Sequence, residues 1–423
     1  MRILLITNAF PPLSIIASHR AYGWARAWAA AGHEVHVLTP TKYPFDGPRD
    51  LVLPTDGLHV HTVSYPWMDQ AGQNSTTENR SQSVPWSHLK QKTRSIRNKL
   101  GLSADIRTLL VPSLVRRGLS IMSDKAFDVI VSMYGPPSII IAAALLQRRT
   151  NIPWVLDYHD LWSGNYAQPR TSFGKRLSHV FEQAIIKRAL MLVTVSHGLA
   201  DYLERSFGVR PYVAYFGYLE DDDDPPSSSY VPRWAPQLVY AGRVYEKYQT
   251  GSKFFACLAR VLARRPELRD GLYVDFYGPD QSALQPMVEG LGIASATRFN
   301  GEVPQQTILA IEREARGLLF FDWVDSSAKG VLTGKLFEYF RNRRPIIFIG
   351  AGFETEASEL ARRSGLAVIL QTEEEIERFL MDWPASLPTL TPDDAVISSL
   401  SCKRQAHLVI SEIETKIQRE LNV

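Results

Sequence analysis

Residues 128–159, DVIVSMYGPPSIIIAAALLQRRTNIPWVLDYH, contain the pattern that decides the fold. An apolar run at 128–134 ends at a Gly-Pro-Pro turn, and an apolar segment of helical length covers 137–148. A second short apolar run follows at 153–159. Short apolar runs separated by a helix indicate parallel strands joined by a crossover helix. This stretch therefore predicts one strand–helix–strand unit of a parallel sheet.

The same alternation continues in both directions. Upstream, the pattern predicts strands at 2–7 and 33–39 around a helix from Ser18 to Ala31. Downstream, it predicts helices at 176–189 and 198–207 around a strand at 192–196. A second series has strands at 237–243, 272–278, 296–303, 317–323 and 344–350, and helices at 251–264, 281–290, 305–315 and 333–341. The fold class is therefore α/β, with two Rossmann-like, doubly wound parallel sheets facing a cleft.

The domain boundaries follow from breaks in this rhythm. Residues 1–215 form the first domain, with an insertion at about 66–117, and residues 216–404 form the second. The charged, Pro- and Ser-rich stretch 220–232 is typical of a linker or loop. A C-terminal helix at about 405–423 is expected to cross back and complete the first domain.

Composition narrows the class of protein. The 423 residues are 45% hydrophobic and 22% charged, and no apolar run reaches the ~20 residues of a membrane span. Two cysteines without metal or redox spacing fit a reducing cytoplasm. Residues 1–215 hold 24 Lys and Arg against 14 Asp and Glu, a net charge of +10, whereas the remainder is acidic. We therefore expect only the first domain to meet an anionic partner.

The insertion carries a basic segment around apolar positions. Its cations are Lys90, Lys92, Arg94, Arg97 and Lys99. Residues 90–117 could lie on an anionic membrane surface, at the inner face of the cell membrane, or form a solvated helix face, and the sequence leaves both readings open. Nucleic-acid binding is disfavoured, because aromatic residues are not interleaved with these cations.

Several familiar sites are missing. No G-x-G-x-x-G follows the first strand and no G-x-S-x-G occurs, which disfavours dinucleotide binding and a serine nucleophile. Gly330, Gly334 and Lys335 imitate a phosphate loop, but the glycine spacing is short and Leu336 replaces the Mg²⁺-binding Ser or Thr. The Asp-x-Asp in 221–224 is better explained as a solvated linker, so no metal site is predicted.

The second half carries the clearer chemistry. Arg243 stands just past a strand end with Lys247 four residues on, and paired cations at such a place suit a diphosphate. Gly278 and Gly301 end two further strands, where backbone can approach a ligand closely. Glu338 falls one turn inside a helix, where its carboxylate could accept from a ribose diol. Together these residues predict a nucleotide-diphosphate clamp.

Six motifs in order resemble the retaining glycosyltransferases of family 4, with the glycosyltransferase-B fold. They are PP with GHEV (11–12, 32–35), DYHDLW (157–162), VTVSHGLADYL (193–203), YAGR (240–243), RFNGEV (298–303) and GKLFEYFRNRRPII (334–347). The resemblance covers nearly the whole chain except about 66–117.

The resemblance implies roles for individual residues. Glu338 corresponds to the ribose-binding second Glu of the E-x7-E motif, and Arg243 to the diphosphate-binding Arg. Lys247 resembles its companion Lys, with Lys253 as a competitor, and His159 lies near the transferred sugar. The remaining counterparts are the amides of Thr333 and Gly334 at the diphosphate, and Gly301, Glu302 and Val303 at the base. Ala17-Ser18-His19-Arg20 occupies the region of the usual glycine pair, and Ser18 and Arg20 are the predicted acceptor-binding residues. Arg20 could touch an anionic acceptor, and an Arg on the helix surface is the alternative.

The chain also departs from the family. Gly330 stands where the first motif Glu is expected, and Phe216-Gly217 replaces Asn-Gly after the hinge. The resemblance implies transfer of a sugar, with retention, from a nucleotide-diphosphate donor, most often UDP, without a further cofactor. The acceptor would be a glycan, a lipid-linked molecule or a small molecule in cell-surface polysaccharide synthesis. A sugar-nucleotide epimerase and a catalytically degenerate nucleotide-binding subunit remain as alternatives.

Overall fold

The computed structural model describes residues 1–65, 106–164, 172–220, 237–245, 248–279, 284–325 and 330–422. The first sheet has the order β3-β2-β1-β4-β5-β6-β7 and is parallel throughout. Its strands are β1 (Arg2–Ile6), β2 (Glu34–Pro40), β3 (Leu58–Val63), β4 (Val129–Met133), β5 (Trp154–Asp157), β6 (Met191–Thr194) and β7 (Tyr212–Val213). Its central strands β1, β4, β5 and β6 are short, mostly apolar and buried, as expected for a parallel sheet covered on both faces, whereas the edge strand β3 is polar at alternate positions and largely exposed.

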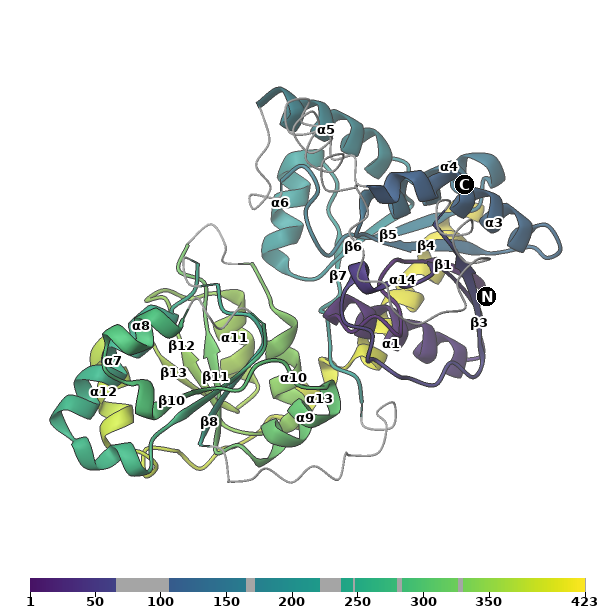
Figure 1. The fold of residues 1–423 in the computed structure, drawn as a ribbon. Coiled ribbons are helices and arrows are strands. Elements are labelled where there is room, and N and C mark those ends of the chain that lie inside the picture. The colour runs from purple at the N-terminus through teal and green to yellow at the C-terminus, as the bar shows by residue number, and fades with distance from the viewer. Residues whose placement is uncertain are drawn as a thin grey trace, which may run out of the picture.

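Helices cover both faces of this sheet (Figure 1). They are α1 (Ile16–Ala30), α3 (Val111–Met122), α4 (Pro137–Thr150), α5 (Ser172–Ile186) and α6 (His197–Phe207), with short 3-10 turns η1 (Pro44–Asp46) and η2 (Ile106–Leu110). The end of the predicted insertion belongs to this layer, because Leu110, Leu114 and Val115 are buried in the core. The insertion at about 66–117 stays a prediction, and residues 66–105 of it lie outside the described residues.

The second sheet has the order β10-β9-β8-β11-β12-β13 and is also parallel. Its strands are β8 (Leu238–Ala241), β9 (Val274–Tyr277), β10 (Thr297–Phe299), β11 (Gly317–Phe321), β12 (Ile346–Ile349) and β13 (Ala367–Leu370). Its helices are α7 (Gly251–Arg264), α8 (Gln285–Gly290), α9 (Gln305–Glu314), α10 (Gly334–Asn342), α11 (Glu356–Arg363) and α12 (Glu373–Met381), with η4 (Pro266–Asp270) and η6 (Ala294–Ala296). The predicted fold class is confirmed.

The end of the chain returns to the first domain. After α13 (Asp394–Ser399), α14 (Cys402–Leu421) packs along α1, where the indole of Trp28 donates to the carbonyl of Ala406 at 2.9 Å (Figure 1). A Cβ at Gly23 would lie 2.6 Å from Cys402 Cβ, so glycine is what allows α1 and α14 to approach this closely. Within the described ranges, no helix combines the length and the apolar composition that crossing a lipid bilayer demands.

Candidate functional site

Three glycines meet at the carboxyl edge of the second sheet. Gly242, Gly278 and Gly301 follow β8, β9 and β10, and all three have positive φ angles. The amide of Gly278 donates to the carbonyl of Gly301 at 2.8 Å. A Cβ on Gly278 would lie 2.7 Å from the carbonyl oxygen of Gly242. This edge lies at the carboxyl ends of the strands, where open α/β sheets bind their ligands.

The predicted cations divide between two places. Arg243 is exposed directly after β8, and its carbonyl accepts a hydrogen bond from the Tyr240 hydroxyl at 2.9 Å. Lys247 lies outside the described residues. Lys253 donates to the carbonyls of Gly350 and Gln371, at the ends of β12 and β13. Lys253 thus contacts the ends of β12 and β13, whereas Arg243 directly follows Gly242 at the end of β8.

Lys335 is a site residue that the sequence analysis did not select. It is the second residue of α10, and its ammonium nitrogen lies 3.3 Å from the centre of the Tyr240 ring. A Cβ on Gly242 would lie 3.2 Å from Lys335 Cε, so the side chain crosses the end of β8. Burial lowers the pKa of Lys335 well below its ordinary value. The Gly-Lys pair was the available signal, but it indicated only a failed phosphate loop.

Glu338 lies one turn further along α10, beside a second carboxyl group. Burial raises the pKa of Glu338 to about 7, and the nearby Lys335 opposes this rise. Glu312 on α9 accepts from the Asn342 side chain at 2.7 Å, and burial together with Glu338 raises its pKa well above the ordinary value. Glu312 is 1% exposed, whereas the Glu338 side chain is 27% exposed. We therefore assign the proton to Glu312 and the charge to Glu338.

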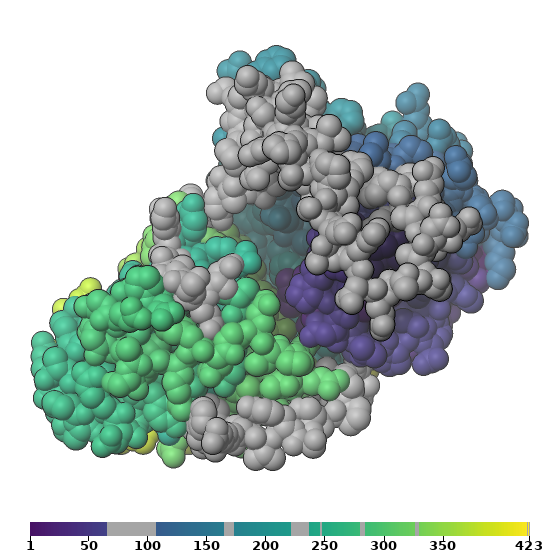
Figure 2. All heavy atoms as spheres, in the orientation of Figure 1, coloured from purple at the N-terminus to yellow at the C-terminus, as the bar shows by residue number. Residues whose placement is uncertain are grey.

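The first domain reaches this carboxylate through α1. His19 Nδ1 lies 3.6 Å from Glu338 Oε1, and His19 Nε2 lies 2.8 Å from the Gln305 amide nitrogen at the start of α9. Burial lowers the pKa of His19 to about 4, so the ring is neutral at pH 7. A Cβ on Gly334 would lie 2.0 Å from Ile16 Cγ1. The N-terminus of α10 thus lies against the first domain, and Figure 2 shows the second domain, in green, in contact with the first, in purple.

A second contact between the domains explains the unexpected Gly330. A Cβ at Gly330 would lie 2.4 Å from the Cα of Gly198, and the reverse holds for a Cβ at Gly198. The carboxylate of Glu356, in the first turn of α11, accepts from the amides of His197 and Gly198 at 2.8 and 3.1 Å. The two backbones therefore touch at the first turn of α6, where no side chain fits at position 330.

Of the site residues predicted in the first domain, Arg20 and Ser18 are buried, and His159 lies beside the same carboxylate that Arg20 binds. Arg20 is 0% exposed and forms two hydrogen bonds with Asp157, at 2.9 and 2.8 Å, while a third nitrogen donates to the carbonyl of Tyr215. The expectation that Arg20 faces the cleft or the helix surface was therefore wrong. Ser18 is likewise 0% exposed. His159 Nδ1 lies 3.3 Å from Asp157 Oδ2, so His159 shares its carboxylate with Arg20.

Electrostatics hold this first-domain group together. Burial acts to raise the pKa of Asp157, but the ion pair with Arg20 and the hydrogen bond from His159 outweigh it and lower the pKa to about 2. The His159 ring also packs edge-on against Phe216, with centroids 5.7 Å apart. His159 is therefore fixed in position at the end of β5, on the carboxyl edge of the first sheet.

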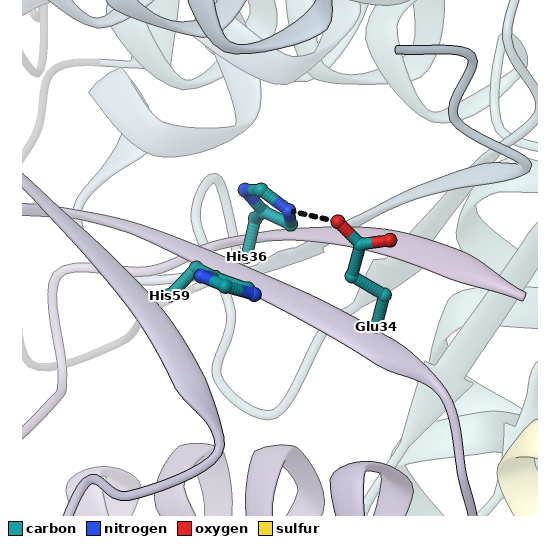
Figure 3. A group of neighbouring side chains, drawn as sticks. All are labelled: Glu34, His36 and His59. Atoms are coloured by element: carbon teal, nitrogen blue, oxygen red, sulfur yellow. Dashed lines mark hydrogen bonds and ion pairs between the residues drawn. The ribbon is translucent and has the colours of Figure 1, made fainter.

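A polar cluster on the outer part of the first sheet forms a separate network (Figure 3). Ligand atoms of Glu34, His36 and His59 lie within 4.8 Å of one another. Glu34 is already paired with Arg2 at 2.8 Å and Lys125 at 3.0 Å, and it lies 3.1 Å from His36 Nε2. These two cations would repel a metal ion, so we interpret the cluster as a hydrogen-bonded network of adjacent strands.

The structure gathers most of the predicted donor-site residues at one edge. Thr333 and Gly334 begin α10, Glu338 follows one turn later, and Gly278 and Arg243 lie at neighbouring strand ends. Gly301, Glu302 and Val303 connect β10 to α9, whose first residue contacts His19. The roles of these residues in donor binding stay predictions.

Comparisons with known proteins agree with this architecture. Residues 17–216 match the family described as "Glycosyl transferase 4-like domain". A search of curated protein sequences returns no match. Among solved structures, the chain resembles a sucrose-phosphate synthase from Thermosynechococcus elongatus, with TM-score 0.56 and 15% identity over 100% of this chain and 99% of that one. It also resembles a UDP-forming trehalose-phosphate synthase from Burkholderia vietnamiensis, with TM-score 0.55 and 12% identity over 99% and 96%.

Proposed function

Since residues 17–216 form a glycosyl transferase 4-like domain and the whole chain has the glycosyltransferase-B fold, we propose that the protein transfers a sugar from a nucleotide-diphosphate donor to an acceptor hydroxyl. The observation that carries this proposal is the placement of Glu338 and Lys335 on one helix, beside Gly242 and Arg243 at a strand end. An anion-binding helix start, the Arg243 guanidinium, the Lys335 amine and the Glu338 carboxylate supply groups for a diphosphate and a ribose.

Each group has a distinct proposed role. Arg243, Lys247 and the α10 amides at Thr333 and Gly334 would hold the diphosphate, and Glu338 would accept from the ribose hydroxyls. The loop of Gly301, Glu302 and Val303 and the nearby Gly278 would border the base. His159, held by Asp157, would orient a hydroxyl of the transferred sugar.

The proposed reaction proceeds with retention of configuration. Charge develops on the departing diphosphate, and fixed cations and helix amides stabilise it without reorganisation. The acceptor hydroxyl attacks from the face of the leaving group, and the departing phosphate takes its proton. No protein nucleophile is then required, and no metal or other cofactor is part of the proposal.

The donor and acceptor are proposed by chemical class. We propose UDP as the carrier, and the base is the first property that the test identifies. A glycan, lipid-linked or small-molecule acceptor is proposed because the first domain has a net charge of +10 over residues 1–215. A place in cell-surface polysaccharide synthesis and a cytoplasmic location at the inner face of the membrane complete the proposal. Residues 90–105 of the basic segment lie outside the described residues.

A nucleotide panel tests the donor site. UDP, GDP, ADP, CMP and dTDP would be titrated by calorimetry into the wild type and into Glu338→Ala. We expect selective binding of one diphosphate, weakened about tenfold or more in Glu338→Ala because the ribose loses a charged hydrogen-bond partner. Glu354→Ala, on the exposed surface, is the control.

The outcomes separate the alternatives. Binding of no nucleotide by folded protein would overturn the proposal. Selective binding without release of sugar to any acceptor would favour a catalytically degenerate subunit. Isomerisation of a bound UDP-sugar without transfer would favour the epimerase alternative.

A further inference from the structure

The helix α5 carries an exposed apolar face that the donor site does not use. Four of its large apolar side chains are exposed: Phe173 at 71%, Val180 at 62%, Phe181 at 51% and Leu177 at 44%. The spacing of four, three and one residues places them on one face of a helix. Apolar side chains that are exposed singly are ordinary, but a continuous stripe marks an interaction surface.

The opposite face of α5 anchors the helix to the first domain. Glu182 is buried, accepts a hydrogen bond from the Tyr158 hydroxyl, and accepts another from the amide of Ser163 at 2.9 Å. The His179 ring stacks on Phe207 of α6, with centroids 4.8 Å apart. The orientation of the helix is therefore fixed by polar and aromatic contacts. Phe181, at one edge of the stripe, also packs edge-on against Trp162, with centroids 6.0 Å apart, yet all four stripe side chains stay exposed.

The exposed charges that α5 itself carries are of one sign, whereas the neighbouring α6 exposes Asp201 and Glu204, each paired with Arg210. On α5 and directly after it, the exposed charged residues are Lys175, Arg176, Lys187 and Arg188. The α5 segment holds one carboxylate, Glu182, which is buried. Helix α4 packs against α5 and ends with two more exposed cations, Arg148 and Arg149. An apolar stripe with a basic border suits an anionic lipid surface, where apolar side chains enter the interface and cations meet the head groups.

We propose that the α5 stripe (Phe173, Leu177, Val180 and Phe181) docks the protein on an anionic membrane surface. A second copy of the chain fits less well, because symmetric pairing of two α5 stripes would bring their basic borders together. α5 lies beside α6, and the first turn of α6 contacts the second domain at Gly330 (Figure 1). Docking through α5 would therefore bring the contact region between the domains near the membrane, where a lipid-linked acceptor would be found.

Vesicle co-sedimentation tests this surface directly. The full chain would be mixed with phosphatidylcholine vesicles and with the same vesicles containing phosphatidylglycerol. We expect binding to the anionic vesicles, weakened by added salt because screening reduces the attraction of the basic border. Phe173→Ser with Val180→Ser should reduce this binding about tenfold, because two apolar side chains no longer enter the interface. Arg176→Glu with Lys187→Glu should reduce it about tenfold or more on anionic vesicles.

A matched control removes equal apolar exposure elsewhere in the first domain. Phe45 is 52% exposed and Val52 is 73% exposed, so Phe45→Ser with Val52→Ser should leave vesicle binding unchanged. Circular dichroism and melting temperature would confirm that each variant is folded. Absence of wild-type binding, or an equal loss in the control pair, would overturn the proposal. A stripe variant that abolishes dimerisation while vesicle binding persists would assign the face to a second copy instead.

This test is independent of the donor site. Vesicle binding needs neither nucleotide nor turnover, so a chain that fails the nucleotide panel can still dock. Conversely, a stripe variant should keep the wild-type nucleotide affinity, because α5 holds none of the residues assigned to the donor.

Discussion

At the scale of single residues, Arg20 shows how burial changes the role of a charged side chain from ligand binding to structural support. Its guanidinium is 0% exposed, yet three hydrogen bonds and the Trp24 ring, 4.2 Å away, replace the lost water. A buried charge without such partners costs several kcal/mol. Arg20 therefore positions Asp157, and through it His159, and is not available to an acceptor.

Asp157→Asn should strongly destabilise the first domain. The substitution leaves the buried Arg20 without its counter-charge, which costs about 3–5 kcal/mol in comparable pairs. Urea unfolding would measure the loss. Asp160→Asn, an exposed carboxylate three residues away, should change stability by less than about 0.5 kcal/mol. Equal stabilities for the two variants would contradict the structural role.

The ionisation of Asp157 also makes the free energy of unfolding depend on pH. Its folded pKa of about 2 lies below the ordinary 3.8, so it contributes stability at neutral pH. That contribution is present above about pH 4 and is lost as pH falls towards 2. In the double variant Arg20→Met with Asp157→Leu, the loss of stability between pH 4 and pH 2 should be smaller than in the wild type. An equal loss in both proteins would contradict the contribution of Asp157.

Glu338 predicts a pH-dependent affinity for nucleotide. Its pKa is raised to about 7, and only the ionised carboxylate is a full acceptor for ribose hydroxyls. Nucleotide affinity should therefore rise between pH 6 and 8 in the wild type and rise less in Glu338→Gln. Calorimetry at several pH values measures the affinity of both proteins. Because the nucleotide titrates identically in the two experiments, its own titration cancels when the two profiles are compared. Parallel pH profiles would mean that Glu338 does not contact the nucleotide.

At the scale of elements, α6 begins with two kinds of cap. Ser196 accepts from the amide of Leu199 at 3.1 Å within the helix, and Glu356 accepts from two amides across the domains. Helix starts carry unpaired amides and a partial positive charge, which favour a carboxylate. One acidic side chain thus joins α11 to α6 without a salt bridge.

Glu356→Ala should loosen the start of α6. Loss of a charged cap costs about 1 kcal/mol, which corresponds to a roughly fivefold larger population of the locally opened state. Amide hydrogen exchange at His197 and Gly198 would detect this change. Glu354→Ala removes a neighbouring, exposed carboxylate that pairs with Arg362 at the surface, and should leave those amides unchanged. If Glu356→Ala also left them unchanged, the interdomain cap would not form in solution.

At the scale of the whole molecule, the domains touch where the proposed diphosphate would bind. Ile16 lies against Gly334 at the start of α10, and Gly198 lies against Gly330. A diphosphate at the α10 amides would need space that Ile16 now occupies. We therefore expect donor binding to be accompanied by a shift of the two domains.

Gly330→Glu should separate the domains. Any side chain at 330 would collide with the backbone of Gly198, since a Cβ there would lie 2.4 Å from its Cα. Small-angle scattering should show a larger radius of gyration than in the wild type. Gly271→Glu is the control, because a Cβ at Gly271 meets no atom within 4 Å. A wild-type radius in Gly330→Glu would show that the domains do not meet in this way.

The fold could be predicted because its cause is local. Apolar runs such as 128–134 and 153–159 become strands β4 and β5, buried on both faces, and the helical segment between them becomes α4. The strand–helix alternation alone requires parallel strands, whatever the side chains do elsewhere. Short edge elements such as β3 and β13 were missed because their apolar patterns are weak and partly exposed.

Glu338 could be selected as a site residue because its motif determines which helix carries it and how far it lies from the start of that helix. Arg20 could not be placed correctly, because its partner Asp157 is 137 residues away. Its burial depends on how α1 packs against β5 and not on the residues around it. Gly330 is similar: the sequence shows a missing Glu, and only the contact with Gly198 gives a steric reason for glycine.

The sequence by itself determined the parallel α/β architecture, the two domains and the helix that carries Glu338, since each depends on periodicity within a short segment. Only the tertiary structure decided which charges are buried and paired, how Lys335 lies over Tyr240, and where the domains touch. These properties depend on distances between residues far apart in the chain, and backbone periodicity carries no information about them.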